Sequence, residues 1–323
     1  MPDPDASVAV RARPRVAITL GDPRGIGPEV TRKALEDPEI AGAADFLLVG
    51  PDAMESGAEY LPVGRWTAGD GAPAAGRLAG LAIEAAVGLA LRGEVQALVT
   101  APIEKAAFRA GGWHFPGHTE MLQELSGAPA VGMMMAADRT LAGAGLRVVL
   151  ATTHLALREV PAALSAELLV EQALLTHAAL QQWWEIPQPA IALCAFNPHA
   201  SDGGLFGDEE ARIISPAVET LRARGIAASG PIPADTVFTR ALRGEFDAVI
   251  APYHDVGMAA FKTAAFGSGV NVTLGLPFPR TSPDHGTALD IAGRGVADAS
   301  SMKESIRLAI RLARRFDTNG ASR

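Results

Sequence analysis

Short apolar runs alternate with longer amphipathic segments along this chain. An apolar run of about four to eight residues between turn residues is typical of a buried strand, whereas apolar positions three and four apart are typical of a helix. The runs that predict strands are residues 16–20, 46–49, 95–99, 133–135, 146–151, 190–196 and 246–251. The segments that predict helices are residues 74–91, 104–110, 120–125, 165–184, 208–224 and 301–316. This alternation predicts an α/β fold with a mainly parallel sheet and helices on its faces.

The length of 323 residues favours two domains with a cleft between them. The first domain is expected to combine residues 1–112 with residues 266–323, and the second to span residues 113–265. Some helix starts also carry a signal, because a serine or threonine before a helix caps its first turn. On that rule Thr119, Ser165 and Ser301 are the expected caps.

Composition excludes several classes of protein. A net charge of −8 disfavours binding to nucleic acid, which needs a basic face. The single cysteine, Cys194, rules out an intramolecular disulfide and a cysteine-rich zinc site. Residues 1–15 lack the apolar core of a signal peptide, and the apolar window 78–91 is short and interrupted by Glu84. These features predict a cytoplasmic protein that does not cross a membrane.

The segment from Phe246 to Asp298 concentrates chemically active side chains. A predicted strand ends in His254 and Asp255, and Lys262, Asn271 and Arg280 follow. An Asp284-His285-Gly286 turn comes next. Two histidines, two cations, an amide and two acids within one short stretch indicate a binding or catalytic site.

Three histidines share one position relative to the predicted sheet. His154, His199 and His254 each follow an apolar strand within a few residues. The carboxyl ends of parallel strands meet at one edge, where ligands bind. Three imidazoles at that edge predict a divalent-metal site with open positions. Nitrogen ligands favour zinc, cobalt or manganese, and magnesium fits if substrate oxygens complete the shell.

The other polar residues sort by charge. Lys262 and Arg280 are suited to hold a phosphate or carboxylate, and Asn271 can donate to the same anion. His118 and Thr119, at a helix entrance, would add donors there. Asp235 is interpreted either as a group that hydrogen-bonds a metal ligand or as a helix cap.

A metal beside an anion clamp suits metal-assisted hydrolysis, or oxidation of an alcohol with hydride transfer to a nicotinamide. The segment Asp284-His285-Gly286-Thr287-Ala288-Leu289-Asp290-Ile291-Ala292-Gly293-Arg294-Gly295 favours the second. It resembles the adenosine-binding loop of isocitrate and isopropylmalate dehydrogenases, which bind NAD without the Rossmann glycine pattern. The glycines of residues 21–27 do not form that pattern either. The cofactor contacts that this resemblance implies are Asp284, His285, Gly286, Thr287 and Asp290.

The whole chain resembles the 4-hydroxythreonine-4-phosphate dehydrogenase family. The matching motifs, in order, are GDPRGIGPE, FPGHTE, TTH, NPHASDGG, PADT, PYHD and NVTLGLPFPRTSPDHGTALDIAGRG. The resemblance implies NAD- or NADP-dependent oxidation of 4-phosphohydroxy-L-threonine and decarboxylation to 3-amino-2-oxopropyl phosphate, in pyridoxal 5'-phosphate biosynthesis. It also implies a homodimer whose subunits share each active site.

The same resemblance implies roles for individual residues. One divalent metal is held by His154, His199 and His254, with the third histidine coming from the partner chain. The substrate is contacted by His118, Thr119, Lys262, Asn271 and Arg280. The candidates for proton transfer are Lys262, Asp235 and Asp255.

The chain departs from the family pattern at a few positions, and these leave alternatives open. Ser201-Asp202 replaces a common Gly-Glu, Val256 a common Gln, and Arg24 a small residue. The alternatives within the family are phosphorylated threonate or erythronate and an aromatic cis-dihydrodiol dicarboxylate. A metal-dependent phosphohydrolase and a non-catalytic binding protein are the alternatives outside it, but neither explains the segment from Asp284 to Gly295.

Overall fold

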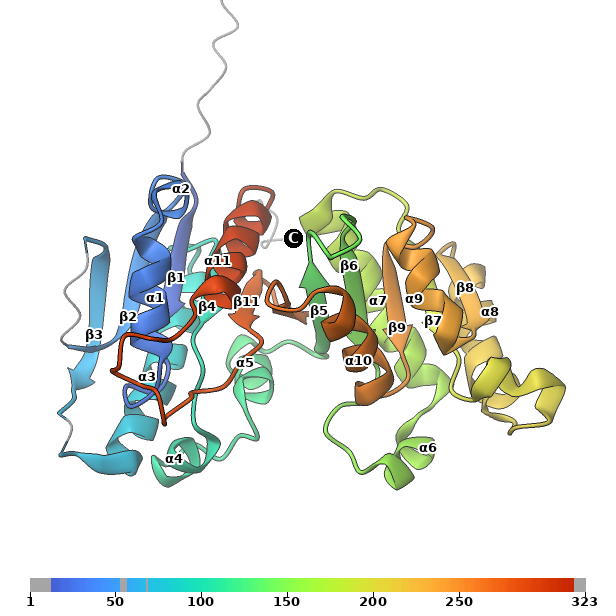
Figure 1. The fold of residues 1–323 in the computed structure, drawn as a ribbon, viewed down its shortest axis with the longest axis horizontal. Coiled ribbons are helices and arrows are strands. Elements are labelled where there is room, and N and C mark those ends of the chain that lie inside the picture. The colour runs from blue at the N-terminus through green and yellow to red at the C-terminus, as the bar shows by residue number, and fades with distance from the viewer. Residues whose placement is uncertain (1–12, 53–56, 68, 317–323) are drawn as a thin grey trace, which may run out of the picture.

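The computed structural model (Figure 1) describes residues 13–52, 57–67 and 69–316, so the expectation for residues 1–12 lies outside the described part. Its strands form one sheet in the order β3-β2-β1-β4-β11-β10-β5-β6-β9-β7-β8. The strands are β1 (Arg15–Thr19), β2 (Asp45–Asp52), β3 (Glu59–Arg65), β4 (Ala97–Thr100), β5 (Gly132–Ala137), β6 (Leu146–Leu150), β7 (Ala190–Cys194), β8 (Ala227–Ile232), β9 (Ala248–Ala251), β10 (Val270–Leu274) and β11 (Arg280–Pro283).

Helices cover both faces of the sheet (Figure 1). The α-helices are α1 (Gly27–Leu35), α2 (Pro38–Ala41), α3 (Gly71–Leu91), α4 (Lys105–Ala110), α5 (His118–Ser126), α6 (Val160–Ala163), α7 (Ala166–Trp184), α8 (Ser215–Ala223), α9 (Ala234–Leu242), α10 (His254–Ala264) and α11 (Ser300–Ala313). Three short segments of other helical type are η1 (Leu157–Glu159), η2 (Pro198–Gly204) and η3 (Glu210–Ile214). Each predicted helix has a counterpart with small shifts at its ends, except residues 208–224, where the π-type segment η3 precedes α8.

The direction of the strands changes at the centre of the sheet. The pairs β11–β10, β10–β5 and β5–β6 are antiparallel. The other neighbouring pairs of the described sheet are parallel. The prediction of a mainly parallel α/β sheet is therefore confirmed, and the antiparallel centre joins two parallel halves.

The buried apolar residues gather on the two sides of this centre. On one side, α1 and α11 pack on one face of β1, β2 and β4, and α3 and α5 on the other. On the other side, α7 and α8 cover one face and α9 and α10 the opposite face. Met121 and Leu122 of α5 pack with Leu98 and Leu276, on the first side. The predicted boundaries near Gly112 and Ala265 stay a prediction.

Helix α3 is apolar enough, over its 21 residues, to pass a length-and-composition test for a membrane span. The structure gives a different reason for that composition, because 61% of its most apolar window is buried inside the protein. Ala82, Ile83 and Ala86 pack against β1 and β2 there. The apolar face of α3 thus serves the core.

Two of the three expected helix caps are wrong. Ser165 does cap α7, since its side chain accepts a hydrogen bond from the Leu168 amide. Helix α5 begins one residue before Thr119, with Gly117 at the cap position. Helix α11 begins at Ser300, and the hydroxyl of Ser301 instead donates toward Gly269 O and Asp284 Oδ1, at 3.1 and 3.0 Å.

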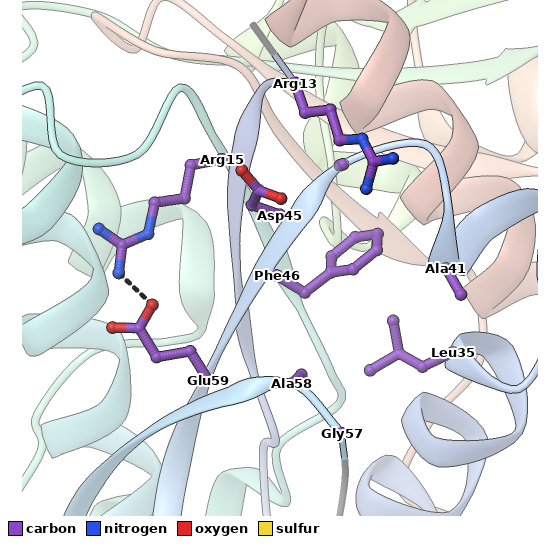
Figure 2. A pocket seen from close by; sticks show the side chains of 10 residues that line it. Arg13, Arg15, Leu35, Ala41, Asp45, Phe46, Gly57, Ala58 and Glu59 are labelled. Atoms are coloured by element: carbon purple, nitrogen blue, oxygen red, sulfur yellow. Dashed lines mark hydrogen bonds and ion pairs between the residues drawn. The ribbon is translucent and has the colours of Figure 1, made fainter.

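Figure 2 shows a cavity of about 710 Å³ at the amino-terminal ends of β1, β2 and β3. Arg15 and Glu59 form an ion pair across it, at 2.6 Å. It contains none of the residues predicted for the site. Ligands of parallel α/β sheets bind at the opposite edge, outside the carboxyl ends of the strands.

Candidate functional site

A second cavity, of about 370 Å³, lies where the two halves of the sheet meet. Strand β4 and the segment after it form one wall, the start of α5 a second, and β10 and β11 the floor. His154, which follows β6, closes the far side. The lining residues used below are Thr100, Lys105, His118, Thr119, Glu120, Met133, Thr153, His154, Asn271, Arg280, Ser282, His285 and Gly286.

The floor follows from the two-residue period of antiparallel strands. Asn271 lies opposite Ser282 in the β10–β11 ladder, and Thr273 lies opposite Arg280. Alternate residues of a strand share a face. The four polar side chains therefore stand together on one face, and three of them line the cavity.

Arg280 is the most unusual group of this floor, because it is a cation with only 2% of its surface exposed. Its Nε and Nη2 donate to Thr100 Oγ1, and its Nη1 donates to Thr273 Oγ1 at 3.0 Å. No carboxylate among the described residues forms an ion pair with it. Burial lowers the pKa of Arg280 to about 9. A buried charge without a counter-ion is costly, so this guanidinium is suited to receive an anion.

His118 stands at the first position of α5, beside the arginine. Its Nε2 is shut off from solvent and has no hydrogen-bond partner in the described chain. Burial, followed by the charges of Arg280 and Lys105, lowers the pKa of His118 well below its usual value. The ring is therefore neutral near pH 7, and a neutral imidazole can donate one N–H to an anion.

Two of the three predicted metal ligands lie together. The ring centroids of His154 and His254 are 5.5 Å apart, and both side chains also line a smaller cavity of about 200 Å³. Burial, followed by the charge of Lys105, lowers the pKa of His154. The Nδ1 of His254 lies 2.7 Å from Asp255 Oδ1. When Nδ1–H donates a hydrogen bond to that carboxylate, the lone pair of Nε2 is available to a metal.

His199 lies apart from this pair. Strand β7 does end at the same edge, because β6, β9 and β7 are parallel neighbours. The next segment, however, runs through six consecutive residues with positive φ, from His199 (52°) to Gly204 (98°). Within the described residues of one chain, no three potential ligand side chains come together.

Carboxylates fix this unusual segment. Glu210, which is 3% exposed, accepts from the amides of Phe196 and Asn197 at 2.9 and 2.6 Å. The Asn197 side-chain amide donates to Glu210 and to Glu209. The segment that carries His199 is therefore held in place at its base, and His199 itself is exposed.

The three candidates for proton transfer do not line the main cavity. Lys262, on α10, lies 3.5 Å from Asp284 and is 46% exposed. Asp235 is exposed in the first turn of α9, where Pro233 occupies the cap position, so it is not a cap. Asp255 instead contacts His254. The proton-transfer role of these residues stays a prediction.

The segment after β11, predicted to bind adenosine, folds against the first loop of the chain. The amide of Ile26 donates to Thr287 O at 2.9 Å, and the amide of Ala297 donates to Glu29 Oε1 at 2.9 Å. Lys33 donates to Gly295 O and Ala297 O. A side chain at Gly25 would start 2.8 Å from Thr287 O, so this contact requires glycine.

The predicted cofactor residues of that segment have different surroundings. His285 and Gly286 line the cavity, and Asp290 is exposed. Asp284 faces inward to Ser301 and Lys262. The cavity therefore opens directly beside the first residues of the predicted cofactor segment.

Sequence reasoning missed several lining residues: Thr100, Lys105, Thr153 and Ser282. Thr100 ends β4 and Thr153 follows β6, so both stand at strand ends, the signal that identified the histidines. Ser282 alternates with Arg280 along β11, and this pattern was available in the sequence. Nothing in the local sequence distinguishes Lys105 from a solvated lysine.

Comparisons with known proteins agree with this geometry. Residues 28–309 match the family described as "Pyridoxal phosphate biosynthetic protein PdxA". The 4-hydroxythreonine-4-phosphate dehydrogenase of Geobacter metallireducens is 43% identical over 341 residues, covering 96% of this chain and 98% of that protein.

Solved structures give the same relationship. The crystal structure of 4-hydroxythreonine-4-phosphate dehydrogenase from Klebsiella pneumoniae has a TM-score of 0.82 and 37% identity, covering 93% of this chain and 99% of that chain. A terephthalate 1,2-cis-dihydrodiol dehydrogenase from Burkholderia xenovorans LB400 has a TM-score of 0.66 and 29% identity, covering 92% and 98%.

The neutral state of His118 predicts a loss of stability in acid. An unfolded chain binds a proton at this histidine as the pH falls through 6.5, whereas the folded chain does not. The free energy of unfolding therefore decreases below that pH, by up to about 1.4 kcal/mol per pH unit for this group. Urea unfolding between about pH 7.5 and 5.5 should show a shallower dependence in His118→Asn. The exposed His114→Asn is the matched control and should keep the wild-type slope, and an equal slope in both variants would contradict the assignment.

Proposed function

The chain belongs to the PdxA family, and we propose that it is an NAD-dependent 4-hydroxythreonine-4-phosphate dehydrogenase acting in pyridoxal 5'-phosphate biosynthesis. The proposal assigns oxidation of the C3 hydroxyl of 4-phosphohydroxy-L-threonine, followed by loss of carbon dioxide. The observation that carries it is the buried, unpaired guanidinium of Arg280 in a cavity that also contains His154 of the histidine pair. The proposal places the enzyme in the cytoplasm.

Arg280 and His118 form the phosphate end of the cavity. Arg280 has five N–H donors, of which Thr100 and Thr273 take three, so two are left for phosphate oxygens. His118 Nε2 adds a donor that the protein leaves unused. Thr119 and Asn271 line the same cavity and supply a hydroxyl and an amide.

His154 and His254 would hold the divalent metal, together with His199 of a second copy of this chain. The pair fits a metal because its ring centroids lie 5.5 Å apart and Asp255 contacts His254 Nδ1. The low pKa of His154 keeps that imidazole unprotonated near neutral pH. Nitrogen ligands of this kind suit zinc, cobalt or manganese.

Each end of the site has its own task. A divalent metal held by the histidines would supply a Lewis acid for the C3 hydroxyl and for the carbonyl oxygen formed from it, and NAD would supply the hydride acceptor. The phosphate clamp of Arg280 and His118 fixes the distance of the reacting carbon from the histidines, which lowers the entropic part of the barrier. Asp255 would accept a hydrogen bond from His254 Nδ1–H, which holds the proton on that nitrogen and leaves Nε2 free.

The position of His199 supports a shared site in a homodimer. Exposed apolar side chains flank both halves of the proposed metal set. Leu205 and Phe206, 72% and 46% exposed, follow His199 in the yellow segment that projects from the body beyond β7 in Figure 1. Leu155 and Leu157, 44% and 66% exposed, follow His154. In a two-fold dimer, Leu205 and Phe206 of each copy would pack against Leu155 and Leu157 of the other, so the contact would occur at both active sites.

The phosphate clamp favours a phosphorylated substrate over a dihydrodiol dicarboxylate. A phosphohydrolase would use the same clamp and metal but would release phosphate without reducing NAD. The segment from Asp284 to Gly295, which lies beside the cavity, supports a nicotinamide enzyme instead.

The first experiment follows NADH absorbance with the purified protein, NAD and 4-phosphohydroxy-L-threonine. We expect NADH formation that a chelator abolishes and a divalent metal restores. NADH formation only with phosphorylated threonate or a dihydrodiol would move the substrate and keep the chemistry. Release of inorganic phosphate without NADH would reject the dehydrogenase.

Arg280→Met tests the phosphate clamp. Losing charge-assisted bonds to a phosphate should lower kcat/KM at least about 100-fold, mainly through KM for the phosphorylated substrate. Inorganic phosphate should raise the Tm of the wild-type protein and not that of the variant, since the stabilisation comes from binding to the folded state. An equal phosphate-induced increase in both proteins would exclude Arg280 from the clamp.

Phe206→Asp tests the shared site. A buried, unpaired carboxylate is costly at an interface, so we expect a shift toward monomer in sedimentation velocity and a loss of activity at the same protein concentrations. Leu141→Asp is the matched control, because Leu141 is 84% exposed and precedes β6, whereas Leu155 and Leu157 follow that strand. Phe206→Asp behaving as a fully active dimer would remove these residues from the interface.

A further inference from the structure

Lys105 is a cation that lines the cavity without a partner. It is the first residue of α4, directly after Glu104, which caps that helix by accepting from the amides of Ala106 and Ala107. Lys105 is exposed and forms no ion pair or hydrogen bond within the described residues. Its Cε lies 3.9 Å from the point where a side chain at Gly117 would begin. The end of the Lys105 side chain therefore lies beside the first residues of α5, which begins with His118.

The electrostatic surroundings place Lys105 between the two ends of the site. Its charge lowers the pKa of His118 together with burial and Arg280, and it lowers the pKa of His154 together with burial. Glu120 also lines the cavity, but it acts on His154, whose pKa it raises. The cation of Lys105 and the cation of Arg280 thus both face His118.

The charge of a phosphate monoester requires a second cation. At pH 7 it carries about −1.5 to −2, while Arg280 supplies a single positive charge and His118 is neutral. The other candidate from sequence, Lys262, is paired with Asp284 at 3.5 Å and does not line the cavity. Arg24, the next cation along the first loop, is paired with Asp22 and Glu104.

We propose that Lys105 is a phosphate-binding residue that completes the charge balance of the Arg280–His118 clamp. This inference rests on the proposed function for the identity of the phosphorylated substrate, but the phosphate site can be tested without turnover. Arg280 binds from the floor of the sheet with fixed geometry. Lys105 acts from the rim as a flexible point charge that can follow the phosphate as it enters.

The test titrates inorganic phosphate calorimetrically into the full-length, metal-loaded protein. We expect Lys105→Ala to weaken phosphate binding about tenfold, the factor that corresponds to loss of one charged hydrogen bond. Lys105→Arg should restore most of the affinity. Arg109→Ala removes an exposed cation from the same helix, outside the cavity, and should bind phosphate as the wild type does. Unchanged phosphate affinity in Lys105→Ala would overturn the proposal.

Kinetics separates phosphate binding from a structural role. In Lys105→Ala the KM for the phosphorylated substrate should rise while the KM for NAD stays constant. The preference for 4-phosphohydroxy-threonine over unphosphorylated 4-hydroxythreonine, as a ratio of kcat/KM, should fall about tenfold. An equal loss for both substrates would place Lys105 on a group that they share and reject phosphate binding.

The two proposals fail in different ways. Phosphate binding that depends on Lys105, in a protein that forms no NADH, would support this inference and reject the dehydrogenase. NADH formation by a Lys105→Ala variant with wild-type phosphate affinity would do the reverse.

Discussion

A guanidinium buried without a carboxylate is the constraint on which the site depends. Arg280 stands on β11 at the place where the parallel strands of one half meet the antiparallel centre, and its hydrogen bonds to the described residues go to the hydroxyls of Thr100 and Thr273. Leaving a charge in this position costs several kcal/mol that an anion would offset. The junction of the two halves of the sheet therefore contains a buried positive charge, which favours an anionic ligand.

The two chemical tasks are assigned to parts of the fold that differ in rigidity. Of the proposed phosphate-binding residues, Arg280 and Asn271 lie on the neighbouring strands β11 and β10, where the ladder fixes Arg280 opposite Thr273. The histidines follow strands, so they sit at loop and helix starts, and Asp255 supplies the orientation that a strand would otherwise give. Sites on strands hold geometry better than sites on loops. If His199 comes from a second copy of the chain, as proposed, the metal-binding part of the site is complete only in the dimer.

Sequence alone could predict the alternation of strands and helices and the clustering of His154 with His254, because apolar runs and strand ends are local signals. It did not identify β10 and β11, whose alternate residues are polar because they face a cavity. The direction taken by His199 depends on a run of positive φ angles. The base of that run is held by a hydrogen bond from the Asn197 amide to Glu210, which no local sequence pattern encodes. The position of Ser301 before an amphipathic segment predicts a helix cap, yet its hydroxyl donates to Asp284 Oδ1.

The departures from the family pattern bear on the substrate only if they reach the cavity. Arg24 does not line the cavity, because its Nε and Nη2 donate to Asp22, which is 1% exposed, and its Nη2 lies 3.5 Å from Glu104. Val256, on α10, is partly buried and packs against the core, and Ser201 and Asp202 lie in η2. Arg24 neutralises a buried carboxylate and ties the first loop to the start of α4. None of these replaced positions lines the cavity that contains the proposed phosphate-binding residues.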